Sequence, residues 1–387
     1  MTSEQASSRI PSNPQSATEQ GNAPSSHGLK IDIEYSNTTP EAANPSVSDT
    51  PISNTPTSNT PTSNTPTSDT PTSNTPTGNP PEDAPPSEAN ATENSTRHEP
   101  PLYFLSVNYY SAALLSDLMH TLETNQGIVI VNNSPADRMV HGLTEQTYGG
   151  GQVTVLDAPE NDGFGSGCNL GLQWIYARSP NALVWLINPD TCLMPNAVST
   201  IRQCFQQQVQ DQNIAILGTP VLDSDGKIWF GSGKFNRWTG SVSAKAIRTA
   251  RGKPAATQPT PTQWVSGCSM ILNLGELGHC PQFDDTYFLY YEDCDLCERY
   301  LQQGRMIAIA PVPLVVHAVS SITSRYPSPK YIYATFSKLT FLHRHATSLA
   351  LWLNLIYLFA QSVLLRFIKP TVAQGRWIGI KHFLNGS

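Results

Sequence analysis

The first 100 residues of this 387-residue chain lack most of what a folded core needs. They contain no cysteine, one aromatic side chain, Tyr35, and three basic side chains against twelve acidic ones. Half of the chain's 32 prolines also lie there. So few apolar side chains cannot offset the conformational entropy that folding removes. We therefore predict a disordered tail over residues 1–100, rich in Pro, Ser, Thr and Asn, which leaves the remainder of the chain for folded structure.

A tandem repeat occupies residues 50–79 of this tail and reads TPISN-TPTSN-TPTSN-TPTSD-TPTSN-TPTGN. The period has no apolar position that could stack into a solenoid, so repeat architectures are excluded. A proline every five residues favours extended backbone, which indicates a semi-stiff spacer. A phosphorylated or glycosylated Ser/Thr tract is the alternative.

The seven cysteines are an odd number, scattered through the part after the tail. A small secreted protein held by disulfides would be shorter and denser in cysteine, so a reducing compartment is the simpler interpretation. The amino terminus also lacks an apolar run after a basic start, and we expect no secretory signal.

Short apolar runs without polar alternation follow the tail. They predict strands at 102–108, 128–131, 153–156, 183–187 and 214–217. Helical spacing of apolar residues lies between several of them, at 112–122, 165–177 and 195–210. Strands of this kind alternating with helices indicate an α/β fold with a mostly parallel sheet covered on both faces. Ligands bind such sheets beyond the carboxyl ends of the strands.

Polar residues stand directly after these runs. Asn108 follows the first run, Asn132 the second and Asn188-Pro-Asp190 the fourth. After the third comes a glycine-rich segment, Asn161–Gly171, that runs into a helix; small residues there allow close backbone approach, and a helix N-terminus favours anions. It fails as a dinucleotide fingerprint because Cys168 stands where the third glycine belongs. A packing turn remains the alternative.

An acidic segment begins a later helix. Glu292 and Asp293 open the sequence EDCDLCER, which enters a helix that ends near Gly304. Acidic residues in a first turn also stabilise the helix dipole, which is the alternative to a catalytic role. His317 ends another apolar run, where a structural histidine is the alternative to a ligand.

These signals, in this order, resemble glycosyltransferase family 2, especially its bacterial rhamnosyltransferase-like branch. The resemblance covers about residues 101–345 and implies a GT-A fold, in which a nucleotide-binding, mostly parallel sheet is flanked by helices. The segments that carry it are Val107–Tyr109, Val131–Asn133, Asn161–Gly171, Leu186–Thr191, Trp264–Gly267, Phe288–Arg299 and His317.

The resemblance implies inverting transfer of a hexosyl group from a nucleoside-diphosphate sugar to an acceptor hydroxyl in polysaccharide or glycolipid synthesis. Rhamnose on a dTDP- or UDP-linked donor is the preferred sugar, and a glycan or lipid-linked molecule is the acceptor. Asp293 matches the general base, and Glu292 the neighbour that orients the acceptor. Asp190 and His317 match ligands of a divalent metal, Mn²⁺ or Mg²⁺, that would stabilise the diphosphate leaving group.

The resemblance also assigns residues to the two substrates. For the donor they are Asn108, Asn132, Asn161, Gly163, Gly165, Asn169, Asn188 and Asp190. For the acceptor they are Trp264, Ser266 and Gly267, with core packing as the alternative for Trp264. Asn132 replaces a carboxylate that is common in the family, which leaves the nucleoside base open. Asn188 replaces the first carboxylate of the metal-binding motif, so we expect activity with fewer protein ligands on the metal. A catalytically weak sugar-nucleotide-binding or scaffold protein is the rival hypothesis, against which the intact Asp190, Asp293 and His317 argue.

Acidic residues are missing from the other end of the chain. Residues 299–387 contain ten Lys or Arg and no Asp or Glu. Within them, 346–365 is an apolar run long enough to span a bilayer, with basic residues on both flanks. Polar residues recur along it at Thr347, Asn354 and Gln361, which favours a helix lying in the interface of an anionic membrane.

We therefore predict that 346–387 is a helical region in peripheral contact with the cytoplasmic face of the plasma membrane. A spanning helix and packing on the protein's own core or a partner subunit are the alternatives. Nucleic-acid binding is disfavoured because the basic charge surrounds an apolar run.

Overall fold

The computed structural model describes residues 99–122, 126–145, 151–245, 257–318 and 327–386. The predicted disordered tail, apart from its last two residues, and the whole pentapeptide repeat lie outside the described residues. All seven cysteines lie inside them and are unpaired.

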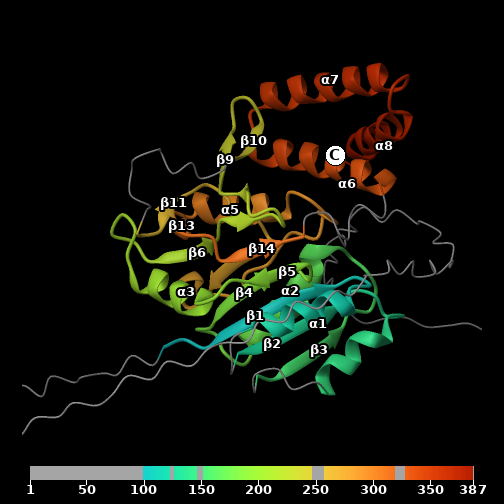
Figure 1. Ribbon diagram of the computed structural model, residues 1–387. Coiled ribbons are helices and arrows are strands. Elements are labelled where there is room, and N and C mark those ends of the chain that lie inside the picture. Colours follow the sequence, from blue (N-terminus) through green and yellow to red (C-terminus); the bar gives the residue numbers. More distant parts are fainter. Residues whose placement is uncertain (1–98, 123–125, 146–150, 246–256, 319–326, 387) are drawn as a thin grey trace, which may run out of the picture. The chain divides into compact units, whose positions relative to one another are not determined.

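An eight-stranded sheet forms the centre of the described part, in the order β11-β13-β6-β12-β4-β1-β2-β3 (Figure 1). Its strands are β1 (Leu102–Asn108), β2 (Gly127–Asn132), β3 (Val153–Asp157), β4 (Leu183–Ile187), β6 (Ile214–Gly218), β11 (Thr260–Pro261), β12 (Ser269–Asn273) and β13 (Met306–Ile309). Strands β3, β2, β1 and β4 are parallel, as are β6 and β13, whereas β12 runs antiparallel between β4 and β6. The predicted α/β fold with a mostly parallel main sheet is confirmed.

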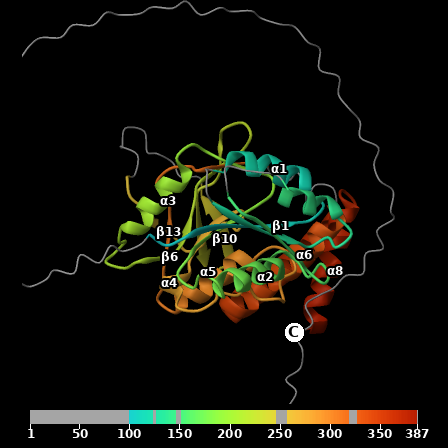
Figure 2. The same ribbon diagram turned by 90° about the horizontal axis from the view of Figure 1, so that it is seen from below.

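Helices cover both faces of this sheet. Figure 2 shows α1 (Ala112–Thr121) and α3 (Ala197–Gln206) on one side, and α2 (Phe164–Tyr176), α4 (Leu274–Leu277) and α5 (Glu292–Gln302) on the other. All five residues of β4 are buried, and the fully buried Trp185 donates its indole N–H to Ser269 Oγ at 3.0 Å. Burial on both faces explains why these strands lack polar alternation in the sequence.

Two smaller sheets were not predicted. One has the order β5-β14-β7-β8 and consists of β5 (Thr191–Leu193), β14 (Val315–His317), β7 (Val221–Leu222) and β8 (Ile228–Phe230). The other is the hairpin of β9 (Ser232–Asn236) and β10 (Ser241–Lys245). A 3₁₀ helix, η1 (Arg138–Glu145), lies beside β3.

Three helices end the chain: α6 (Pro327–His345), α7 (Ser348–Leu365) and α8 (Pro370–Gly386). They pack against one another, and α6 also contacts α5. Thr347 begins α7 as its N-cap, because its Oγ1 accepts a hydrogen bond from the Ala350 N–H at 3.2 Å. The predicted helical region from residue 346 thus consists of α7 and α8, whereas α6 had no counterpart in the prediction.

Candidate active site

Four polar side chains meet where β1, β2 and β3 end. Asn108 pairs in register with Asn132, which pairs with Asp157. The Nδ2 of Asn108 donates to Asn132 Oδ1 at 3.0 Å and to Asp137 Oδ2 at 3.1 Å, and Asn132 Nδ2 donates to Asp157 Oδ1 at 2.9 Å. Both asparagines are fully buried. Sequence reasoning missed the two carboxylates, although Asp157 directly follows the third apolar run.

The buried Asn133 links this edge to the glycine-rich segment. Its Nδ2 donates to the carbonyl oxygen of Gly163 at 2.7 Å and to Asn161 Oδ1 at 3.4 Å. Asn161 Oδ1 also accepts the Gly163 N–H at 3.1 Å. Two residues assigned to the donor, Asn161 and Gly163, therefore lie next to the strand ends.

The glycine-rich segment packs closely on the chain between residues 283 and 288. Gly163 has φ of +97°, and a Cβ there would lie 2.1 Å from the carbonyl oxygen of Phe288. A Cβ on Gly165 would lie 2.9 Å from Phe283 Cβ. Asn169 donates to the Phe283 carbonyl oxygen at 2.9 Å and accepts its N–H at 2.7 Å. These contacts are those of a packing turn, and the assignment of the three residues to the donor stays a prediction.

Asp190 and His317, which are 127 positions apart, lie side by side. Because His317 of β14 pairs in register with Thr191 of β5, its Nε2 comes within 3.1 Å of Asp190 Oδ1. The two residues are 7% and 6% exposed, and the ring of Trp229 meets the His317 ring edge-on at 4.9 Å between centroids. Asn188, the other polar residue of this turn, is partly exposed.

Asp190 and His317 could together provide two of the ligands of a divalent cation, with the remaining coordination positions filled by a bound substrate or by water. The Nε2 of His317 contacts Asp190, and its buried Nδ1 has no hydrogen-bond partner. Apart from the contact with Asp190, the imidazole is therefore available to a ligand. Among the described residues no group of three or more His, Cys, Asp or Glu side chains could hold a metal. Carboxylate and imidazole suit Mn²⁺ or Mg²⁺, whose other positions water and phosphate oxygens can fill.

A strained turn presents the acidic pair. Tyr290 and Tyr291 have φ of +70° and +68°, in the left-handed region that costs a non-glycine residue about 1 kcal/mol or more. The turn places Glu292 and Asp293 in the first turn of α5. The Asp293 carboxylate accepts the N–H of Gly267 at 3.0 Å through Oδ2 and that of Cys294 at 2.8 Å through Oδ1.

The two carboxyl groups differ in their surroundings. Burial raises the pKa of Asp293, while the N–H groups of Gly267 and Cys294 act in the opposite direction. Burial, and then the charge of Asp293, raises the pKa of Glu292 to about 8, and Glu292 Oε2 has no hydrogen-bond partner. The two N–H groups favour the ionised form of Asp293, whereas Glu292 Oε2 has no such donor, so Asp293 is the candidate proton acceptor.

We expect Glu292→Gln to stabilise the folded protein in a pH-dependent way. Below pH 4.5 the Glu292 carboxyl is protonated in both the folded and the unfolded chain, so variant and wild type should have equal free energies of unfolding. Between pH 4.5 and about 8 the unfolded chain releases this proton and the folded chain keeps it, which lowers wild-type stability as pH rises. The variant's advantage should grow by up to about 1.4 kcal/mol per pH unit.

Urea unfolding at pH 4.5, 6 and 8 measures this difference, with Glu145→Gln at the surface as the matched control. A stability difference that does not change with pH would contradict the protonation of Glu292.

The three residues assigned to the acceptor are Trp264, Ser266 and Gly267. Gly267 contacts Asp293 through its N–H, as described, and Ser266 Oγ accepts the Cys268 N–H at 3.4 Å. Trp264 is partly buried, and its ring lies tilted against that of Phe230 with 5.1 Å between the centroids. It also covers Gly233 of β9, where a Cβ would lie 2.4 Å from the indole. Trp264 thus packs on the hairpin while its remaining surface stays accessible.

Comparison with known families matches residues 110–339 to the model described as glycosyltransferase like family 2. An N-acetylglucosaminyl-diphospho-decaprenol L-rhamnosyltransferase of Mycobacterium tuberculosis (strain CDC 1551 / Oshkosh) is 23% identical over 236 residues, which cover 55% of this chain and 73% of that protein. A low-salt glycan biosynthesis hexosyltransferase of Haloferax volcanii is 21% identical over 235 residues, covering 61% of this chain and 73% of that protein.

Similar solved structures include GalNAc-T7 with UDP, GalNAc and Mn²⁺, at a TM-score of 0.45 and 13% identity over 57% of this chain. The chain spans 44% of the length of that protein. Another is residues 1–349 of S. aureus TarS, at a TM-score of 0.41 and 11% identity, covering 74% of this chain and 90% of that one.

Proposed function

The chain belongs to glycosyltransferase family 2, and we propose that it transfers a sugar with inversion from a nucleoside diphosphate to an acceptor hydroxyl. One observation carries this proposal: two consecutive residues join the acidic pair to the Asp190 turn. The N–H of Gly267 binds the Asp293 carboxylate at 3.0 Å, and the carbonyl oxygen of Cys268 accepts the N–H of Asn188 at 3.2 Å. The segment Gly267–Cys268 therefore holds both the proposed base, Asp293, and the turn that contains Asp190, the proposed cation ligand.

The proposed reaction is a single displacement. The acceptor oxygen bonds to the anomeric carbon, the bond from that carbon to the diphosphate oxygen breaks, and the acceptor proton passes to the Asp293 carboxylate. Asp293 is held at both carboxylate oxygens by backbone N–H groups, so its orientation is fixed before an acceptor arrives. A divalent cation held by Asp190 and His317 would supply charge stabilisation for the leaving diphosphate.

The substrates are proposed from the site and from the relatives. Asp137 and Asp157 bring negative charge to the strand ends where Asn132 replaces the family's carboxylate, so a nucleobase N–H can still meet a charged acceptor there. The mycobacterial relative is named for L-rhamnose and a decaprenyl-diphosphate-linked acceptor. On that similarity we propose rhamnose as the sugar and a lipid-linked glycan as the acceptor. Acceptor-dependent release of the nucleoside diphosphate from the donor tests the proposal.

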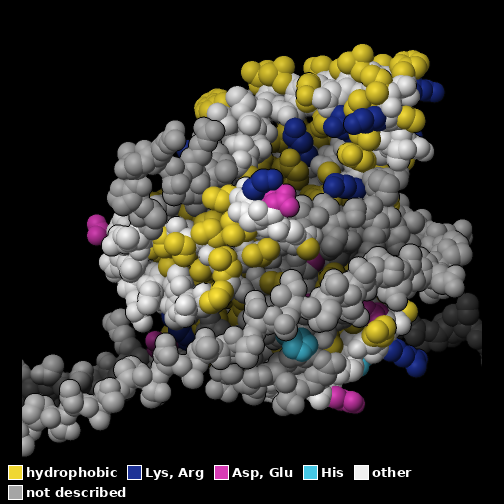
Figure 3. All heavy atoms as spheres, viewed as in Figure 1, with side chains coloured by type: hydrophobic (Ala, Val, Ile, Leu, Met, Phe, Trp, Pro, Cys, Tyr) yellow, Lys and Arg dark blue, Asp and Glu magenta, His cyan; other side chains and the backbone are white. Residues whose placement is uncertain are grey.

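We also propose that α7 attaches the enzyme to a membrane. Among the described helices α7 alone is long and apolar enough to cross a bilayer, with a mean hydropathy of 1.7 and 22% of its residues buried. Figure 3 shows hydrophobic side chains gathered over α7. The exposed ones are Leu349, Trp352, Leu353, Ile356, Tyr357, Phe359, Val363 and Leu364. Contiguous exposed apolar side chains of this kind mark sites of contact with a membrane or another protein.

The other side of α7 is occupied by protein, which favours a helix lying on the membrane over one that spans it. Leu358 is buried against α6 and α8, and Asn354 Nδ2 donates to the carbonyl oxygen of Thr239 at 2.9 Å. The exposed basic residues nearby are Arg366, Lys369 and Lys381. Basic charge beside an apolar face with interfacial aromatic side chains suits anionic lipid headgroups. With the unpaired cysteines, this supports a place on the cytoplasmic face of the plasma membrane.

We expect Trp352→Glu and Ile356→Glu each to weaken binding to anionic vesicles by about 10-fold or more, because each removes apolar surface from the lipid and adds a charge. Co-sedimentation of the full chain with phosphatidylglycerol vesicles measures the affinity, and phosphatidylcholine vesicles should bind less. Met139→Glu, at a side chain that is 75% exposed on η1, is the control. Unchanged vesicle binding, or a protein that forms dimers through α7 and does not bind vesicles, would contradict membrane attachment.

A further inference from the structure

The helix that carries Asp293 holds a second carboxylate, Asp295, which the proposed reaction does not use. Asp295 is fully buried. Its Oδ1 accepts hydrogen bonds from Tyr287 OH at 3.2 Å and from His345 Nε2 at 2.8 Å, and its Oδ2 accepts one from Arg299 Nε at 2.7 Å. Burial alone would raise the pKa of Asp295, but the bonds from His345 and Arg299 outweigh it and hold that pKa below its usual value. A buried, ionised carboxylate with three donors fixes the elements that supply them.

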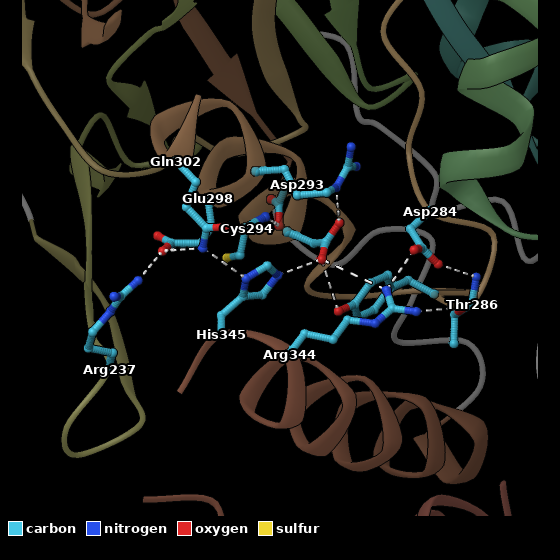
Figure 4. A network of polar contacts seen from close by, with 12 residues as sticks. Arg237, Asp284, Thr286, Asp293, Cys294, Glu298, Gln302, Arg344 and His345 are labelled. Atoms are coloured by element: carbon cyan, nitrogen blue, oxygen red, sulfur yellow. Dashed lines mark hydrogen bonds and ion pairs between the residues drawn. The ribbon is translucent and has the colours of Figure 1, made fainter. Parts of the chain in front are cut away.

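One of these donors, His345, lies at the end of α6, and its neighbour Arg344 also faces Asp295. Figure 4 shows His345 and Arg344 pointing into a polar network around α5. The other ring nitrogen of His345, Nδ1, lies 3.4 Å from Gln302 Nε2, so α5 contacts both ring nitrogens. Arg344 lies 3.9 Å from Asp295 and pairs with Asp284 at 2.6 Å. The end of α6 is therefore fastened along α5 and to the segment on which the glycine-rich turn packs.

The same junction also holds the β9–β10 hairpin. The Thr347 N–H donates to the carbonyl oxygen of Arg237 at 2.9 Å, and the Arg237 guanidinium pairs with Glu298 of α5 at 3.0 Å. At the base of this hairpin the Gly233 N–H donates to the carbonyl oxygen of Trp264 at 3.1 Å. We call residues 344–347 the elbow. The elbow thus contacts α5, the helix that carries Asp293, and also the hairpin that supports Trp264.

We propose that Asp295 and His345 are positioning residues for sugar transfer. Through them the elbow fixes the position of the Asp293 carboxylate relative to Trp264, which is assigned to the acceptor. This inference rests on the proposed function. The base must lie within hydrogen-bond reach of the acceptor hydroxyl, and a displacement of about 1 Å can cost about 10²-fold in rate. Asn108 and Asn132, which are assigned to the donor, belong to β1 and β2. A change in the elbow should therefore alter the turnover rate without changing the affinity for the nucleotide.

The pair His345→Leu and His345→Gln tests this proposal in the full chain. Leucine fills the space but cannot donate to Asp295, whereas the amide Nε2 of glutamine can. We expect kcat for transfer to fall about 10²-fold in the leucine variant and to recover in the glutamine variant. The dissociation constants of UDP and dTDP, measured by calorimetry, should stay at their wild-type values in both.

Two further variants complete the design. Arg305→Gln, which removes the 3.5 Å pair with Glu276 at the far end of α5, should leave kcat unchanged. Asp295→Asn keeps an acceptor for Tyr287 and His345 but removes the charge, and it replaces the leucine variant if that protein does not fold. Wild-type kcat in the leucine or asparagine variant, an inactive glutamine variant, or parallel losses of kcat and nucleotide affinity would overturn the proposal. A wild-type chain without transfer activity would instead overturn the proposed function.

Discussion

Replacing Asp293 by asparagine should lower the rate of sugar transfer by about 10²- to 10⁴-fold, the range that a general base contributes. The asparagine amide oxygen can still accept the Gly267 N–H, so the local structure should persist while the group that takes the proton is lost. Donor affinity should be unchanged, because the residues that we assign to the nucleotide, at the ends of β1 to β3, belong to other elements. Steady-state transfer with a radiolabelled donor and calorimetry with the nucleoside diphosphate separate the two quantities.

The matched control is Asp225→Asn, which removes an exposed carboxylate whose ion pair is with Lys227 in a surface turn. That variant should transfer sugar at the wild-type rate. If Asp293→Asn did the same, Asp293 would not be the base, and Glu292 would be the next residue to replace.

Replacing Asp190 by asparagine should lower turnover by about 10²-fold or more, since it removes the one carboxylate of the proposed cation site. His317 would remain as a single protein ligand, so the divalent cation should bind more weakly. We expect the Mn²⁺ concentration that gives half-maximal activity to rise, and excess Mn²⁺ to restore part of the rate. A chelator should abolish the wild-type activity.

Asn188→Asp provides the opposite change in the same turn. The Asn188 side chain is partly exposed, and a carboxylate there would add a second oxygen ligand, so half-maximal activity should need less Mn²⁺. An Asp190→Asn enzyme with the metal dependence of the wild type would contradict the assignment of the cation to Asp190 and His317.

The central strands could be predicted because each is a continuous apolar run whose burial on two faces leaves a clear mark in the sequence. The polar residues after these runs could be placed at one edge for the same reason, since parallel strands end together. Asn108 and Asn132 do meet there, at 3.0 Å. The resemblance to a known family, and not the pattern of residues, assigned Asp293 and Asp190 to their roles.

Other features depend on pairings between distant segments that no local pattern encodes. Strand β12 runs antiparallel between β4 and β6, yet its apolar run resembles those of the parallel strands. Its direction and its place in the sheet therefore could not be predicted from the sequence. His317 reaches Asp190 because β14 pairs with the three-residue β5, which is too short to predict. The same holds for Asn169, whose amide serves the backbone of Phe283, 114 positions away.

The role of α6 was also out of reach of the sequence. Its aromatic, mixed pattern has no clear periodicity, and the sequence indicates Arg344 only as one of the basic residues that flank the apolar run. The partner of Arg344, Asp295, lies in the first turn of α5, where the helix dipole alone accounts for an acidic residue. Only the packing of α6 on α5 shows that His345 and Arg344 both reach the buried Asp295 carboxylate.

The most direct test of glycosyl transfer is the release of nucleoside diphosphate by the full chain from a panel of dTDP-, UDP- and GDP-sugars. The panel is run with Mn²⁺ or Mg²⁺ and a prenyl-diphosphate-linked N-acetylglucosamine acceptor. We predict release from one donor, dTDP-rhamnose being the first to try, that requires both the cation and the acceptor and is lost in Asp293→Asn. Equal release by wild type and Asp293→Asn, or no release from any donor on vesicles that bind the protein, would contradict the account.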